Sequence, residues 1–229
     1  MNTARSSTNE PAVSLHGLAT ASISDALDKL GLPGSLHGVG PLRPGQQACG
    51  PAYTVRYEPV GEQRGTVGDF LDDVAPGSVV VIDNDGRTDC TVWGGIMTQV
   101  AAHRGVAATV INGVCRDVET TTSTDYRIWS AGRFMRTGKD RVRLRAVQEP
   151  LTIDGVTIRP GDLVCCDEDG VVVVPVERLA EVTAVAEGIE RVEAAIVHAV
   201  LAGASLAEAR TAQGYHSLQT PTAALGGAV

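Results

Sequence analysis

The feature that most constrains the fold is the continuous apolar run at residues 106–111, which is rich in β-branched side chains. Such a run indicates a strand that is buried on both faces, as in a parallel sheet covered by helices. Before it, Gly94-Gly95 leads into residues 96–101, whose apolar spacing predicts a short helix. Gly105 follows as a typical helix stop. This helix–strand unit predicts an α/β fold.

The residues that flank the unit suggest a binding site. Asn112-Gly113 predicts a turn after the strand, and Arg116-Asp117 then stands where a new helix begins. In open α/β sheets, ligands bind beyond the carboxyl ends of the strands. Arg116 is suited to clamp a carboxylate or phosphate through two parallel hydrogen bonds.

Two further groups fit a small carboxylate beside a metal ion. The first turn of the predicted helix offers the backbone N–H groups of Gly95, Ile96 and Met97 to an anion, and Gly94 lets a ligand approach the backbone closely. Asp117 is a hard oxygen ligand of the kind that binds magnesium or manganese.

Simpler interpretations of the same residues stay open. Gly94-Gly95 is also compatible with an ordinary loop, and an adjacent Arg-Asp pair is often a surface feature. Asp117 is also a favoured N-cap for a helix that starts at Val118. The combination within one unit is what favours a functional site.

Composition excludes several classes of protein. The chain has 229 residues, which predicts one domain at 13–212, with a flexible terminus at 1–12 and an irregular tail at 213–229. A net charge of −8 argues against a nucleic-acid partner, and no stretch resembles a membrane span or a signal peptide. The five cysteines follow no zinc spacing, so we expect reduced thiols in a cytoplasmic protein.

The rest of the chain alternates between strand and helix signals. We expect short helices at 15–20, at 22–30 with Ser22 or Ser24 as cap, and at 65–74, and a long helix at 176–202. Strands are expected at 48–57, 79–83, 127–130 and 133–145, with hairpins around Asp154-Gly155 and Asp169-Gly170. The polar loop at 83–89 is expected to border the site, and residues 205–208 form a capping-box pattern.

The pattern resembles the RraA-like family, which includes the RNase E activity regulator RraA and the class II 4-hydroxy-4-methyl-2-oxoglutarate aldolases. The resemblance covers residues 22–206. The matching positions are Gly94, Ala101, Gly105, Val110-Ile111, Gly113, Arg116-Asp117 and the strand at 127–132. It implies a swivelling β/β/α fold and a homotrimer or a hexamer built as a dimer of trimers.

For the site, the resemblance implies that Arg116 and Asp117 are catalytic and that Asp117 binds Mg²⁺ or Mn²⁺. It also implies that a glutamate of a neighbouring subunit's C-terminal helix approaches the metal, and Glu193 matches best, with Glu190 second. One departure is clear. The aldolases carry an acidic residue directly after the helix-opening glycine, where this chain has Gly95.

The hypothesis is therefore a metal-dependent lyase that cleaves a 2-oxo acid to pyruvate, with oxaloacetate decarboxylation as a side activity. The only two lysines, Lys29 and Lys139, lie outside the helix–strand unit, which disfavours a Schiff-base aldolase. The alternative is a non-catalytic regulator that binds another protein, as RraA does.

Overall fold

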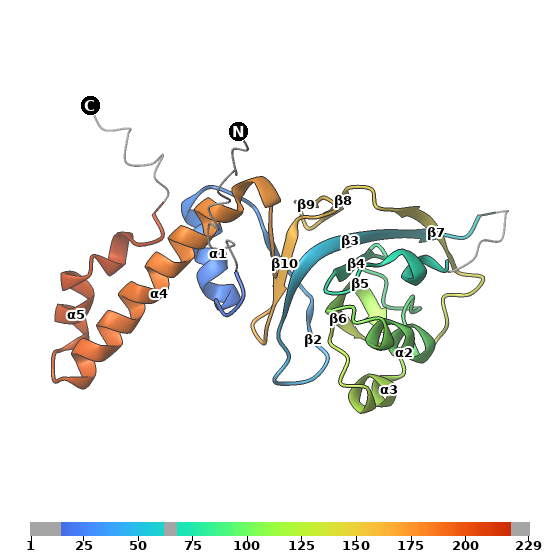
Figure 1. Cartoon of the computed structure of the whole chain (residues 1–229), viewed down its shortest axis with the longest axis horizontal. Helices are drawn as coiled ribbons and strands as arrows, with labels where there is room; N and C mark the ends of the chain where they lie inside the picture. Colours follow the sequence, from blue (N-terminus) through green and yellow to red (C-terminus); the bar gives the residue numbers. More distant parts are fainter. Residues whose placement is uncertain (1–14, 62–67, 221–229) are drawn as a thin grey trace, which may run out of the picture.

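A computed structural model of the chain describes residues 15–61 and 68–220. Within them, nine strands form one curved sheet in the order β1-β11-β10-β3-β4-β5-β6-β2, with β7 paired to β3 (Figure 1). The strands are β1 (Ser35–Leu36), β2 (Gly40–Pro41), β3 (Ala48–Pro59), β4 (Val79–Asp83), β5 (Ala108–Cys115), β6 (Ile128–Arg133), β7 (Val142–Val147), β10 (Leu163–Cys166) and β11 (Val171–Val174). A separate hairpin joins β8 (Leu151–Ile153) to β9 (Val156–Ile158).

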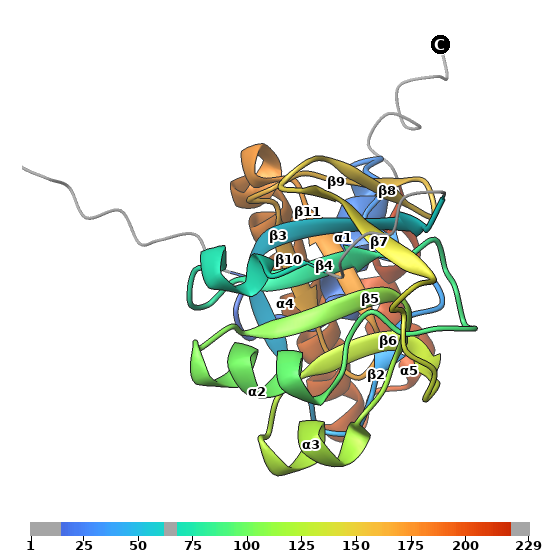
Figure 2. The ribbon, with the colours of Figure 1, turned by 90° about the vertical axis from the view of Figure 1, so that its right-hand side faces the viewer.

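The helices fall into two groups on either side of this sheet. Near its parallel part lie α2 (Gly95–His103), α3 (Val118–Ser123) and the short 3₁₀ turn η1 (Phe70–Asp73), as Figure 2 shows. At the other end, α1 (Thr20–Lys29) packs on α4 (Leu179–Leu201), which is followed by α5 (Leu206–Ala212). The remaining 3₁₀ turns are η2 (Val176–Arg178) and η3 (Tyr215–Ser217). The mixed α/β class predicted from the sequence is confirmed.

The parallel strands β3, β4, β5 and β6 explain the continuous apolar runs. In β4, Val80 and Ile82 enter the core under α2, whereas Val79 and Val81 enter the core on the opposite face. Both faces are therefore covered, and an alternating polar face is absent from this strand. The third core lies between α1, α4 and the outer face of β10 and β11.

Several local predictions are confirmed by the backbone. Asp154 and Gly155 both have positive φ, 49° and 80°, as a two-residue hairpin requires. Ser205 and Glu208 form the predicted capping box at the start of α5. The long C-terminal helix is present as η2 followed by α4.

Other local predictions are wrong. Residues 15–18 form a turn instead of a helix, because Gly17 has φ of 92°. Neither Ser22 nor Ser24 caps α1, which begins at Thr20, and the Asp167 carboxylate accepts the Thr20 N–H at 2.8 Å. A cap supplied from 147 residues away leaves no local signal.

The predicted turn at Asn112-Gly113 is also wrong, because β5 runs through both residues. Gly113 has φ of 146°, and the pairing with β6 shifts register between Ile111 and Val114. The strand therefore absorbs the glycine as an irregularity and carries the chain on to Arg116.

The basic stretch expected to be a strand at 133–145 is strand only at Arg133, where β6 ends, and from Val142 onward. Residues 134–141 instead form a loop that is tied to Thr91 by the Thr91 N–H···O=C bond to Arg136 and by a bridge to Thr137. The terminus at 1–12, residues 65–67 of the expected helix and the tail from 221 lie outside the described residues.

The expectation of five reduced cysteines is contradicted by a disulfide between Cys49 and Cys165. The two residues are direct partners in the antiparallel register of β3 and β10, a proximity that 116 residues of sequence separation hide. Cys90, Cys115 and Cys166 are free and buried.

The close packing of β3 on the start of β4 leads to a stability prediction. A Cβ on Gly50 would lie 2.1 Å from the carbonyl oxygen of Gly77. We expect Gly50→Ala to lower the free energy of unfolding by about 3 kcal/mol, because backbone must move to relieve the overlap. Gly40→Ala in β2 is the control, since its Cβ would meet nothing within 4 Å. Equal urea midpoints for both variants would contradict this packing.

Candidate functional site

Six of the predicted site residues line one hollow of about 490 Å³. The start of α2 contributes Gly94, Gly95, Ile96 and Met97, and the segment after β5 contributes Arg116 and Asp117. The loop before β7 contributes Thr137, Gly138 and Lys139. Because β4 and β5 are parallel, the hollow lies beyond their carboxyl ends, where α/β sheets bind ligands.

Asp117 has an unusual backbone conformation for a residue that is not glycine. Its φ and ψ are 60° and 47°, in the left-handed region, and it stands at the N-cap position of α3. Its side chain does not cap that helix. Instead, the Gly95 N–H donates to Asp117 Oδ2 at 2.7 Å, so the carboxylate is directed at the start of α2. Aspartate adopts the left-handed conformation more readily than most residues, as Asp85, Asp125 and Asp154 also do in this chain.

Arg116 is held between the two walls of the hollow. Its backbone N–H donates to the Trp93 carbonyl at 3.1 Å, and its guanidinium Nη1 donates to the Met135 carbonyl at 3.4 Å. Arg116 Nε lies 3.6 Å from Asp117 Oδ2, and both side chains are partly exposed. The guanidinium therefore faces the hollow while keeping donors for a ligand.

The two glycines have different steric roles. A Cβ on Gly94 would lie 2.8 Å from Asp117 Oδ2 and 3.0 Å from Arg116 Nε. A Cβ on Gly95 would meet Thr120 Oγ1 at 3.2 Å and Asp117 Oδ2 at 3.3 Å, which is tight but less severe. The absence of a side chain at position 94 is thus what allows the arginine and the aspartate to approach the helix start.

The start of α2 also offers hydrogen-bond donors. The first bond along the helix runs from Thr98 N–H to the Gly94 carbonyl, so the N–H groups of Gly95, Ile96 and Met97 have no partner in the helix. Asp117 takes the Gly95 donor. The N–H groups of Ile96 and Met97 are the two that a bound anion can use.

The donor set fits a hydrated divalent cation better than a cation held entirely by protein. Magnesium commonly binds through one or two carboxylates and keeps several waters. Asp117 supplies one carboxylate, and Gly95 N–H occupies only its Oδ2. Across residues 15–61 and 68–220, no group of three or more His, Cys, Asp or Glu side chains is arranged to hold a metal ion. Zinc-type coordination by several side chains is therefore not what this pocket offers.

A glutamate from a neighbouring subunit's helix and a polar loop of the same chain were expected beside the site. Glu190 and Glu193 belong to α4, at the far end of the molecule from α2 (Figure 1), and Glu190 accepts the Ala19 N–H at 3.1 Å. The loop at 83–89 does not border this hollow. Asp83 and Asp85 line a different one, where Asp83 accepts from Asn112 Nδ2 at 3.0 Å.

Sequence reasoning missed the wall formed by Thr137, Gly138 and Lys139. A Cβ on Gly138 would lie 2.5 Å from the Thr91 carbonyl oxygen, so this loop is pressed against the chain that leads into Trp93. The basic residues of this loop suggested an exposed strand in the sequence. Only the contact with Thr91 in the folded chain places Lys139 at the pocket.

Cys115 precedes Arg116 but is not a reactive thiol. Its side chain is fully buried, and burial raises the pKa of the thiol, which disfavours the reactive thiolate. Cys115 therefore contributes packing beneath the pocket.

The chain thus combines an α/β sheet with a glycine-opened helix that faces an Arg-Asp pair, and this combination places it in a class that a family comparison identifies. The model of the family described as "RraA-like: Aldolase/RraA" matches residues 20–173, and the chain belongs to this family. No helix among residues 15–61 and 68–220 has the length and apolar character to cross a membrane.

Three similar proteins illustrate the relationship. Protein DlpA of Legionella pneumophila is 43% identical over 195 residues, which are 83% of this chain but only 32% of DlpA. A Halalkalibacterium halodurans protein, named as a proposed 4-hydroxy-4-methyl-2-oxoglutarate aldolase, is 34% identical over 69% of this chain and 73% of its own. The crystal structure of an uncharacterized Pseudomonas syringae pv. tomato protein is 48% identical, with a TM-score of 0.79, and covers 85% of this chain and 93% of its own.

Proposed function

We propose that this protein is a divalent-metal-dependent lyase that cleaves a 2-oxo acid of the 4-hydroxy-4-methyl-2-oxoglutarate type to pyruvate. Oxaloacetate decarboxylation would be a second reaction of the same site, because it also leaves the enolate of pyruvate. The observation that carries the proposal is the convergence of Arg116 and Asp117 on the start of α2 within one hollow. The names of several relatives, at 29–35% identity, support the same chemistry.

The chain's own residues divide the work of binding. Arg116 and the N–H groups of Ile96 and Met97 hold the carboxylate next to the 2-oxo group. Asp117 holds a magnesium or manganese ion, which when bound supplies a Lewis acid for charge that develops on the enolate oxygen. Arg116 adds positive charge on the same side, in a pocket that is already organised before the substrate arrives.

The position of Lys139 extends this proposal to the substrate's far end. 4-Hydroxy-4-methyl-2-oxoglutarate and oxaloacetate each carry two carboxylates, and Lys139 lies in the same hollow as Arg116. Lys139 is exposed, whereas lysines that form Schiff bases are usually desolvated. We therefore assign it to binding the second carboxylate.

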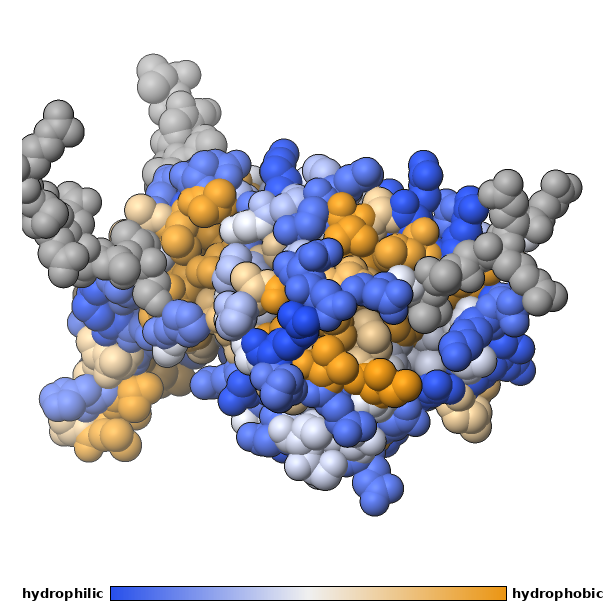
Figure 3. All heavy atoms as spheres, turned by 45° about the vertical axis from the view of Figure 1, so that its right-hand side comes forward, coloured by the Kyte–Doolittle hydropathy of each residue, from blue (hydrophilic) through white to orange (hydrophobic). Residues whose placement is uncertain are grey.

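A homotrimer, or a dimer of trimers, would complete the site. Within one chain α4 lies far from the pocket (Figure 1), so only another copy can bring Glu193 to Asp117. Apolar atoms gather at the end of the α4–α5 arm (Figure 3), where Val197 and Leu201 are 57% and 84% exposed. That surface supports contact with another subunit, and light scattering after gel filtration would measure the number of copies.

The test of the activity is pyruvate release, followed with lactate dehydrogenase. Oxaloacetate and 4-hydroxy-4-methyl-2-oxoglutarate are each supplied with magnesium, manganese or a chelator. We expect release that depends on the metal. No release under any condition, together with a stoichiometric protein partner in a pull-down and no metal binding, would favour the regulator alternative instead.

Lys139→Met should raise the KM for both dicarboxylates by about three- to fivefold, the loss expected for one exposed ion pair. The KM for the monocarboxylate 4-hydroxy-2-oxopentanoate should hardly change. Lys29→Met is a matched control, because it removes the other lysine, in the last turn of α1. An equal rise for both substrate types would contradict the assignment, and borohydride trapping of pyruvate on Lys139 would show a Schiff base.

A further inference from the structure

Both cysteines of the Cys49–Cys165 disulfide line a second hollow, which is separate from the Arg116 pocket. This cysteine pocket has a volume of about 460 Å³ and is lined by Cys49, Cys165, Thr20 and Arg127, among others. Gly77 and Ala107, which precede β4 and β5, also line it. It therefore lies at the amino ends of the parallel strands, whereas the Arg116 pocket lies at their carboxyl ends.

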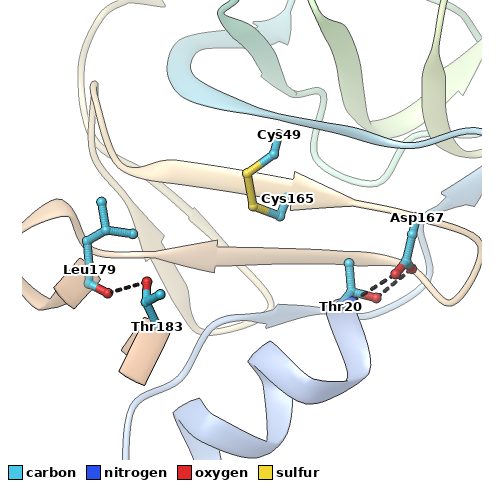
Figure 4. The surroundings of a disulfide bond; sticks show 6 residues. All are labelled: Thr20, Cys49, Cys165, Asp167, Leu179 and Thr183. Atoms are coloured by element: carbon cyan, nitrogen blue, oxygen red, sulfur yellow. Dashed lines mark hydrogen bonds between the residues drawn. A yellow bond between two sulfur atoms is a disulfide. The ribbon is translucent and has the colours of Figure 1, made fainter. Parts of the chain in front are cut away.

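The pocket gives small molecules a path to the disulfide. The bond joins β3 to β10 (Figure 4). Cys49 is half-buried, whereas Cys165 is only 3% exposed, so Cys49 is the more accessible of the two. A volume of this size admits a low-molecular-weight thiol. Disulfide exchange requires such access for the attacking thiolate.

The neighbouring Cys166 also borders the pocket, but its side chain lies on the face of β10 away from the bond. It is on the opposite face of β10, in the core with Val164 and Val171, whereas Cys165 packs toward α1 and α4. Burial raises the pKa of the Cys166 thiol well above its usual value, which disfavours the thiolate that exchange requires. Reduction of the bond therefore depends on an external thiol.

The bond crosses the junction between β10 and β3, which joins the β1-β11-β10 end of the sheet to its parallel part. β10 meets β3 through four residue pairs, Cys165 opposite Cys49 among them, and Pro51 in this ladder has no N–H to donate. Through β10, the strands β11 and β1 and the helices packed on them are attached to the rest of the sheet.

The same junction also fixes the start of α1. Asp167, directly after β10, accepts the Thr20 N–H at 2.8 Å and the Thr20 hydroxyl at 2.5 Å (Figure 4). Its backbone carbonyl accepts Trp129 Nε1–H at 2.7 Å. Motion of β10 relative to β3 would therefore reach both α1 and β6.

We propose that the Cys49–Cys165 disulfide is a reversible clasp, exchanged by small thiols through the cysteine pocket, that sets how firmly the α1–α4 layer is held on the sheet. A thiolate attacks Cys49 Sγ, the S–S bond breaks, and Cys165 leaves as a thiolate that takes up a proton. A second thiol then attacks the mixed disulfide, so that two small thiols become one small disulfide and the protein gains two thiols.

The first test counts thiols in the denatured wild-type protein. Of the five cysteines, three are free in the oxidised form, so we expect three reactive thiols after air oxidation and five after incubation with millimolar glutathione. The change should reverse when oxidised glutathione is added. Five thiols in both samples, or a bond that resists glutathione in the folded protein, would overturn the proposal.

The second test measures hydrogen exchange of the folded wild-type protein in both redox states. Reduction should speed exchange of the amides in α1, β10 and β11 at least about tenfold and leave α2 and α3 unchanged. Cys166→Ala should keep this redox response. Cys49→Ser should lose it, because α1, β10 and β11 should exchange fast in both redox states. Unchanged exchange in reduced wild type would overturn the role as a clasp, whether or not the variants fold.

Discussion

Asp117→Asn is expected to abolish metal-dependent pyruvate release, lowering kcat/KM by about 10³-fold or more, because it removes the one negative charge proposed to hold the cation. The amide oxygen of asparagine can still accept the Gly95 N–H that now bonds to Asp117 Oδ2 at 2.7 Å. Asparagine also tolerates the left-handed backbone conformation. The substitution therefore removes charge while the fold should be kept.

Three measurements separate the proposed role of Asp117 from a structural one. Calorimetric titration with manganese should show weaker binding, thermal unfolding should change little, and the coupled assay should lose its metal dependence. Glu119→Gln is the matched control, since it removes an exposed carboxylate two residues away, in the first turn of α3. If the asparagine variant retains wild-type turnover with magnesium, Asp117 is not the metal ligand.

Gly94→Ala should lower kcat/KM by about 10–100-fold while leaving the protein folded, because small displacements of catalytic groups cost this much. The new Cβ would lie 2.8 Å from Asp117 Oδ2 and 3.0 Å from Arg116 Nε, so both side chains must move. The backbone itself is no obstacle, since φ and ψ of −150° and −166° are available to alanine.

Gly95→Ala provides the comparison at the next position. Its Cβ contacts are longer, at 3.2 and 3.3 Å, and alanine favours the helix that begins there. We therefore expect a smaller loss of activity than for Gly94→Ala. Comparable losses in the two variants, or a large drop in melting temperature for Gly94→Ala, would mean that displacement of the Arg-Asp pair is not the cause.

The departure at Gly95 bears on how tightly the metal binds. An acidic residue at this position would carry its Cβ close to Thr120 Oγ1 and Asp117 Oδ2. Groups of this kind orient metal-bound water, and their loss commonly costs about 10–100-fold in metal affinity or activity. We therefore expect the chain to require a higher magnesium concentration than a relative with an acidic residue there, which a metal titration of activity would measure.

Two features of the candidate site could be predicted from the sequence because the signals are local. The apolar run at 106–111 and the stop at Gly105 predicted the helix–strand unit, which is present as α2 and β5. A helix start and the chain after a parallel strand lie at the same edge of a sheet, so Arg116 and Asp117 fall beside Gly94 through chain geometry alone.

The contribution of Lys139 could not be predicted in this way. It depends on the loop at 134–141 folding back onto Thr91, a contact between segments some 45 residues apart in sequence that no periodicity records. The direction of the Asp117 side chain could not be predicted from the sequence either. Its residue type predicted a cap for α3, but the left-handed backbone turns the carboxylate toward Gly95 on another helix.

The sequence by itself determined the elements whose signals lie within a few residues, such as the α4 periodicity, the Asp154-Gly155 turn and the buried strands. Only the tertiary structure decided which distant groups meet. It paired Cys49 with Cys165, capped α1 with Asp167 and brought Lys139 to the Arg116 pocket. The physical reason is that backbone propensities and hydrophobic periodicity act over single turns, whereas strand register and loop packing are settled by burial across the whole sheet.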